Sequence, residues 1–138
     1  MPDHVEGNGT QGDPWILTTP PGKSEFDAWR DEAADPPALR IRVGSTNLSY
    51  QLRGIEDLHA MLVDHGDWVL LGNADEQKEA SAGTVEAWAR SAGNPVQGWY
   101  GLRNGYRGRF GNYVPPVLEH LGLAEVEHNA RNNRMRAL

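Results

Sequence analysis

The residues best suited to chemistry lie in residues 98–112, GWYGLRNGYRGRFGN, which we name the arginine loop. Arg103, Arg107 and Arg109 alternate there with aromatic residues and glycines. Guanidinium groups suit phosphate oxygens, aromatic rings stack on bases, and glycine lets a backbone approach a phosphate closely. The arginine loop therefore predicts a surface that binds nucleic acid or another anion.

A second basic group stands near the end of the chain, where arginines alternate with asparagines in NARNNRMR. A basic ribbon of this kind contacts phosphates or enters a minor groove. Together with the arginine loop it defines six predicted nucleic-acid-binding residues. These are Arg103, Arg107, Arg109, Arg131, Arg134 and Arg136. The alternative is that the arginines pair with acidic residues of the chain itself while the aromatics pack in the core.

Charge is distributed unevenly along the 138 residues, whose net charge is -6. Residues 1–97 contain 7 Lys or Arg and 16 Asp or Glu, whereas residues 98–138 contain 6 Arg and 3 Glu. Such an asymmetry directs an anionic partner to one end of a protein that otherwise repels it.

The pattern of histidines, carboxylates and serines predicts no catalytic centre. His59 and His65 are six residues apart, which places them on different faces of a helix, and no HExxH, GxSxG, Walker or dinucleotide-binding motif occurs. We therefore expect no metal and no cofactor. Whether the protein is an enzyme stays open, with His59 or His65 as the residues that an enzyme would use.

Alternating apolar residues predict an antiparallel hairpin over residues 39–53, and helical spacing predicts a helix over residues 55–65 that ends at Gly66. Short strands are expected at residues 14–19 and 68–71, separated from later elements by an acidic loop at residues 72–81. The spacing of apolar residues in residues 24–32 fits a helical turn and an irregular strand equally.

In the second half we expect a helix over residues 85–92, with Thr84 as its N-cap, and a helix between Pro115 and Gly122. A two-stranded ribbon, residues 123–128 and 134–138, closes the chain, with residues 129–133 as its turn. Val126 and Met135 are predicted to meet across this ribbon.

These elements predict an α+β fold: a small antiparallel sheet with a packing helix, followed by a C-terminal part that resembles a winged helix. We expect a flexible tail at residues 1–13 and a single domain at residues 14–138, with subregions 14–73 and 80–138. The resemblance to a winged helix rests on the order of loop, short helix and ribbon. It departs from that pattern at Glu119, which would repel phosphate from the helix in the recognition position.

Three phrases, DLHAMLVDHGDWVLLG, GTVEAWARS and GRFGNYVPPVLEHLGLAEVEHNARNNRMRAL, resemble a small uncharacterised bacterial protein family. That resemblance implies a bacterial, cytoplasmic setting and no particular activity. The chain has no cysteine, no apolar run of the roughly 18 residues that cross a bilayer and no secretory signal pattern, so we expect a cytoplasmic protein without a membrane partner.

We expect non-catalytic binding of DNA or RNA through the arginine loop and the C-terminal ribbon. A second hypothesis is a protein-interaction module, in which the ribbon forms the edge of a homodimer. A third is a small-molecule enzyme.

Overall fold

The computed structural model describes residues 7–138 and contains two antiparallel sheets and four helices among them. The first sheet has the strand order β1-β2-β3-β4. Its strands are β1 (Trp15–Thr18), β2 (Glu25–Asp31), β3 (Ala38–Val43) and β4 (Thr46–Gln51). The second sheet has the order β5-β7-β6. Its strands are β5 (Val69–Leu70), β6 (Ala124–Val126) and β7 (Arg134–Ala137). The helices are α1 (Gly54–His65), α2 (Val85–Trp88), α3 (Phe110–Tyr113) and α4 (Pro115–His120).

The first sheet is built on the predicted hairpin. Ile41 pairs with Leu48 across β3 and β4, and Gly44 turns the chain between them with a φ of 57°. Residues 24–32, whose spacing fits a helical turn and a strand equally, contain strand β2. This strand pairs with both β1 and β3. Phe26 and Ala28 are buried on its core face. Pairing on both sides satisfies its backbone groups, which decides in favour of the strand.

The second sheet joins segments that are far apart in the chain. Met135 of β7 pairs with Val126 of β6, as the sequence predicts, and on its other side with Val69 of β5. All three side chains are buried. The pairing of β5 with β7 fixes the chain after α1 against the C-terminal ribbon.

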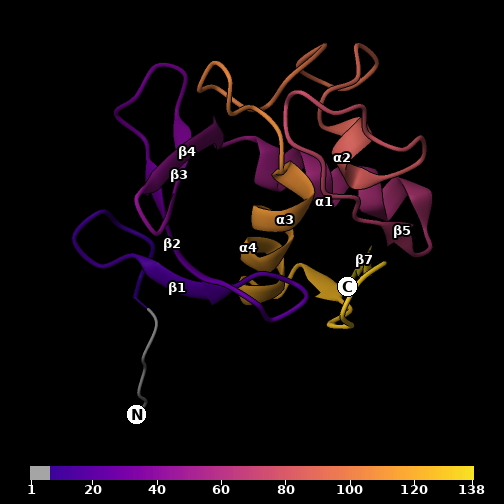
Figure 1. The fold of residues 1–138 in the computed structure, drawn as a ribbon, viewed down its shortest axis with the longest axis horizontal. Coiled ribbons are helices and arrows are strands. Elements are labelled where there is room, and N and C mark those ends of the chain that lie inside the picture. The colour runs from indigo at the N-terminus through magenta and orange to yellow at the C-terminus, as the bar shows by residue number, and fades with distance from the viewer. Residues whose placement is uncertain (1–6) are drawn as a thin grey trace.

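Helices fill the space between the two sheets. Figure 1 shows α3 and α4 at the centre, with the first sheet on one side and β5 and β7 on the other. Helix α1 ends at Gly66, as predicted, in a left-handed cap with a φ of 75°. Thr84 caps α2, as predicted, by accepting the Ala87 N–H at 3.1 Å, but α2 is a single turn that ends at Trp88.

The α+β fold is confirmed, with a four-stranded antiparallel sheet, a packing helix and a small second sheet. The winged-helix resemblance is not established. Helices α2 and α3 have four residues each, and α4 has six, so none offers the length of a helix that lies along a DNA groove.

The N-terminal tail was predicted to span residues 1–13. Residues 1–6 lie outside the described residues. Beyond them, the Gly7 N–H donates to the Pro14 carbonyl at 3.0 Å, and the Arg30 N–H donates to the Gly9 carbonyl at 2.9 Å. No helix within residues 7–138 combines the length and the apolar character needed to cross a membrane.

Candidate ligand-binding cleft

Two arginines of the arginine loop face carboxylates of the acidic loop, residues 72–81. Arg107 Nε lies 2.7 Å from Glu76 Oε1, and the Arg107 backbone N–H donates to the same oxygen at 3.0 Å. The hydrogen bond from the Arg107 side chain lowers the pKa of Glu76. Arg109 Nη2 lies 3.8 Å from Asp75 Oδ2. The arginine loop and the acidic loop are separate in the sequence, but they lie together in the fold. Their opposite charges therefore largely cancel.

The third arginine of the loop, Arg103, contacts neutral partners. Its guanidinium donates to the carbonyl of Asn47 and lies 4.0 Å from the ring centroid of Tyr106. Arg103 and Tyr106 are both exposed. The pair links the arginine loop to the hairpin of the first sheet.

The arginines of β7 also have acidic partners, which lie on strand β6 and directly after it. Arg134 Nη2 lies 2.7 Å from Glu127 Oε2, and Arg136 Nη2 lies 2.9 Å from Glu125 Oε1. Both guanidinium groups lie over the ring of Trp68, at 5.0 and 4.6 Å from its centroid. The outer face of the second sheet therefore presents paired charges.

Arg131 differs from the other five predicted residues. It is exposed in the ribbon turn, residues 129–133, and within residues 7–138 it has no ion pair, hydrogen bond or ring contact. Among the described residues, its guanidinium is thus the one of the six with no partner that a ligand would first have to displace.

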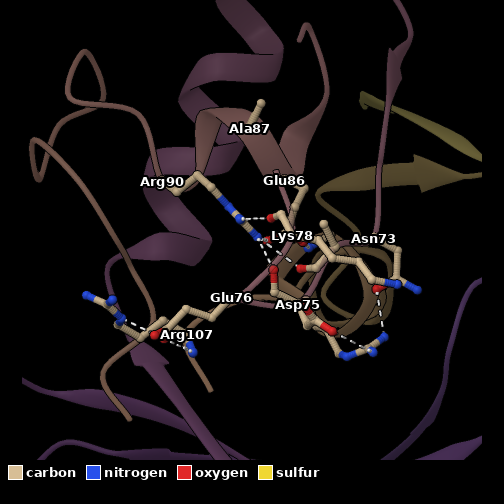
Figure 2. Close-up of polar contacts among 12 residues, drawn as sticks. Asn73, Asp75, Glu76, Lys78, Glu86, Ala87, Arg90 and Arg107 are labelled. Atoms are coloured by element: carbon tan, nitrogen blue, oxygen red, sulfur yellow. Dashed lines mark hydrogen bonds and ion pairs between the residues drawn. The ribbon is translucent and has the colours of Figure 1, made fainter. Parts of the chain in front are cut away.

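A buried carboxylate holds the two loops together (Figure 2). Glu86, on α2, is 1% exposed and accepts hydrogen bonds from Arg90 Nη2 and from the Gly111 N–H, each at 2.8 Å. Burial raises the pKa of Glu86, while the hydrogen bond from Arg90 acts in the opposite direction. Arg90 also donates to the carbonyls of Ala74 and Lys78, at 2.9 and 2.8 Å. The pair therefore anchors the acidic loop to α2 and α3.

Trp99 extends this network to the arginine loop. Two guanidinium groups lie over its ring, with Arg90 at 4.4 Å and Arg107 at 4.6 Å from the ring centroid. Glu86 and Arg90 were not among the residues predicted from the sequence. Their spacing of four residues on a predicted helix was the available signal, but such pairs also form on the solvent-exposed surface of a helix.

The ribbon turn forms one wall of a cleft of 480 Å³. The β1–β2 turn, the chain after β5, the start of α2 and the start of α3 provide the other walls. Residues from these segments that line it include Pro20, Lys23, Asn73, Thr84, Asn112 and Arg131. We refer to this space as the cleft.

Backbone hydrogen bonds fix the walls of the cleft. The Leu71 N–H donates to the Asn133 carbonyl, and the Glu86 N–H donates to the Leu71 carbonyl, each at 2.9 Å. Gly111 lies so close to the chain after β5 that a Cβ there would be 2.5 Å from the Leu71 carbonyl oxygen. The buried Asn133 uses its side-chain amide on the backbone of Asn129. The ribbon turn is thereby held in one conformation beside α3.

The chemistry of the cleft is cationic and rich in amides. Among the described residues that line it, the charged side chains are Lys23 and Arg131, and no carboxylate takes part. Asn73, Asn112 and Asn132 add side-chain amides, which both donate and accept hydrogen bonds. Asn132 has a φ of 60°, in the left-handed region that asparagine tolerates. Such a lining suits an anion that also carries polar groups.

The histidines do not form a metal site in the described part of the chain, which contains no group of three or more His, Cys, Asp or Glu placed to hold an ion. His59 and His65 both lie on α1, and His65 is exposed. Neither lines the cleft.

No curated protein and no solved structure matches the chain. A family model described as a family of unknown function (DUF6855) matches residues 7–138, which is nearly the whole chain. The chain therefore belongs to this family of unknown function, in agreement with the resemblance to an uncharacterised family.

Proposed function

We propose that the protein is a non-catalytic binding protein whose cleft holds the phosphate group of its ligand between Lys23 and Arg131. One observation carries this proposal. The protein has a net charge of -6, yet the charged side chains in the described lining of the cleft are both cations. A concave site of one charge in a protein of the other concentrates the complementary ligand.

The size and polarity of the cleft support a small ligand. Its volume of 480 Å³ falls within the range of about 300–1,000 Å³ that is typical of small-molecule sites. Guanidinium and ammonium groups bind phosphate oxygens, and the amides of Asn73 and Asn112 suit the hydroxyl or ring atoms of the rest of the ligand. A mononucleotide combines these features.

Nucleic acid provides the same phosphate chemistry, and it was the ligand class that the sequence predicted for six arginines. Arg107, Arg109, Arg134 and Arg136 already face carboxylates, whereas Arg131 faces none within residues 7–138. A strand bound through the cleft would therefore depend on Arg131 and Lys23 first. The other five arginines remain candidate contacts of a longer strand.

Titration calorimetry with a mononucleotide and fluorescence anisotropy with a labelled single-stranded oligonucleotide test the proposal. We expect Arg131→Ala with Lys23→Ala to weaken binding of both probes about tenfold or more, since charge-assisted hydrogen bonds are lost. Arg103→Ala is the matched control, because it removes an exposed arginine that does not line the cleft, and we expect it to change the affinity less than about twofold.

The salt dependence separates the cleft from a wide basic surface. For a single strand, two cations correspond to a slope of about -1.4 in a plot of log K against log salt, and six correspond to about -4. A steep slope, combined with equal losses of affinity in Arg103→Ala and Arg131→Ala, would assign binding to all six predicted arginines. Oligonucleotide binding without mononucleotide binding would identify nucleic acid as the source of the phosphate. If neither probe binds at low salt, the proposal is wrong.

A further inference from the structure

His128 joins three segments beside the cleft. Its Nε2 lies 2.6 Å from Glu119 Oε2 on α4, and its Nδ1 lies 3.0 Å from the carbonyl oxygen of Pro20 in the β1–β2 turn. His128 itself directly precedes the ribbon turn. The imidazole therefore connects α4, the β1–β2 turn and the base of the ribbon.

Both partners of the ring are hydrogen-bond acceptors. An ionised carboxylate and a carbonyl each need a donor, and a neutral imidazole has only one N–H. The two contacts are made together only by the imidazolium form, in which both nitrogens donate. The hydrogen bond to Glu119, with further support from the Pro20 carbonyl, raises the pKa of His128 above its ordinary value of 6.5. Loss of the proton removes one of the two contacts.

The position of these contacts matters for the cleft. Pro20 and Pro21 form part of the cleft wall, and Lys23 follows in the same turn. The ribbon turn, which begins after His128 and contains Arg131, forms another part of the wall. A change in the contact between His128 and Pro20 therefore acts on the segments that carry both cations.

Among the described residues, the lining of a pocket beside His128 shows which other titratable groups lie near the ring. The pocket on the other side of His128 is lined by Thr18 of β1, by Pro116, Glu119 and His120 of α4, and by apolar residues. His120 lies 5.7 Å from Trp15 between ring centroids. Glu119 and His120 are thus the titratable neighbours of His128 in this lining. The second of them is a histidine whose own titration the experiment must separate.

We propose that His128 is a positioning residue whose protonation holds the β1–β2 turn against the ribbon, so that the cleft binds its anion more tightly when His128 is charged. This inference rests on the proposed function, because it concerns the same cleft. The stabilising contribution of protonated His128 is fully present below pH 6.5, the ordinary pKa of histidine. It is lost as the pH rises through the raised pKa of His128 in the folded protein. By linkage, a bound anion must raise the pKa of His128 further.

The test uses probes whose own charge does not change between pH 5.5 and pH 8.5. Sulfate and a short oligodeoxythymidylate meet this condition, because their acidic groups are ionised throughout. For the wild-type protein we expect the affinity to fall about fivefold across this range, the size of a modest coupling. In His128→Gln, and in Glu119→Gln, we expect a profile that is nearly flat and close to the weaker, high-pH affinity.

His120→Gln and His59→Gln are the controls for a general loss of positive charge. Both lose one titratable histidine without removing the contacts of His128, so each should keep the wild-type profile. An unchanged pH profile in His128→Gln overturns the inference while leaving the proposed function intact. A profile that flattens equally in His120→Gln also overturns it.

A measurement without ligand separates the two proposals further. In NMR titrations of the free protein, the amide signals of residues 19–24 should shift with the same midpoint as the ring protons of His128, and should not do so in His128→Gln. Amide signals that do not follow His128 contradict the positioning role. If no probe binds at any pH, the proposed function and its regulation both fail, even where the β1–β2 turn follows the protonation of His128.

Discussion

The arginine loop and the ribbon turn contain the same side chain in two different electrostatic surroundings. In the arginine loop, Arg107 and Arg109 face Glu76 and Asp75 of the acidic loop. In the ribbon turn, Arg131 faces a cleft whose described lining contains no carboxylate. An unpaired guanidinium binds an anion without first giving up a carboxylate partner, so we expect Arg131 to bind more readily than Arg107 or Arg109. The difference therefore depends on the neighbours that the fold brings, and counting arginines along the chain does not reveal it.

The largest effect is expected at the buried carboxylate that holds the two loops in contact. Glu86→Ala leaves the guanidinium of Arg90, whose side chain is 13% exposed, without its carboxylate and leaves the Gly111 N–H without its acceptor. Breaking a buried ion pair costs about 3–5 kcal/mol. We expect a loss at the lower end of that range, about 3 kcal/mol, in the free energy of unfolding measured with urea.

Glu86→Gln retains hydrogen-bonding groups and should lose less. The matched control is Glu125→Ala, which removes an ion pair whose two side chains are each 48% exposed and should cost no more than about 0.5 kcal/mol. Equal losses in Glu86→Ala and Glu125→Ala would show that the buried network does not hold the loops together.

A smaller effect is expected where the two loops touch directly. A Cβ at Gly108 would lie 2.5 Å from the carbonyl carbon of Asp75 and 2.6 Å from the Glu76 backbone nitrogen. Gly108→Ala therefore has to push the acidic loop away from the arginine loop. Such overpacking costs about 1–3 kcal/mol, which thermal unfolding will detect.

Gly93→Ala is the control for this substitution, since the nearest atom to its Cβ would be the Ser91 hydroxyl oxygen at 3.6 Å. We expect Gly93→Ala to leave the unfolding midpoint nearly unchanged. If Gly108→Ala also leaves it unchanged, the acidic loop is not packed closely against the arginine loop.

The smallest expected effect is on oligonucleotide affinity, and it tests the difference between paired and unpaired arginines most directly. Asp75→Asn with Glu76→Gln removes the charges that face Arg109 and Arg107 and leaves the cleft lining intact. If pairing is what makes the arginine loop a poor anion site, oligonucleotide affinity at low salt should rise about threefold, in keeping with the modest strength of exposed pairs. Mononucleotide affinity in the cleft should not change.

The pH dependence provides a second measurement on the same pair. Arg107 lowers the pKa of Glu76, so the stability that this pair contributes is present above the ordinary value of 4.5 and is lost as the pH falls through the lowered value. Acid unfolding should therefore be less steep in Glu76→Gln than in the wild-type protein. An unaltered acid transition would mean that the pair contributes nothing to stability.

Local patterns predicted much of the fold. Alternation identified the hairpin and the pairing of Val126 with Met135, and the acidic first turn with a terminal glycine identified α1. Each of these signals operates within a few residues of the chain, where periodicity and capping chemistry are informative. Local patterns did not decide between helix and strand for β2, because its strand conformation depends on pairing with β1 on one side and β3 on the other.

The residues that line the proposed cleft were predicted only in part. Arg131 was included among the six arginines, but nothing in its sequence neighbourhood distinguished it from Arg134, three residues later, which has a carboxylate partner. Lys23 was missed because it lies more than one hundred residues from Arg131 in the chain. Glu86 was missed because a carboxylate is expected on the outer face of a helix unless a partner is visible.

The sequence by itself determined the α+β class, the main elements and the basic character of the C-terminal segment, because these depend on residue type and short spacing. The tertiary structure alone decided which charges are paired, where the cleft opens and which cations line it. Those properties arise from contacts such as that of β5 with β7 and of His128 with Pro20. Ion pairing and cleft geometry change over a few ångströms between segments far apart in the chain, and local periodicity contains no information on that scale.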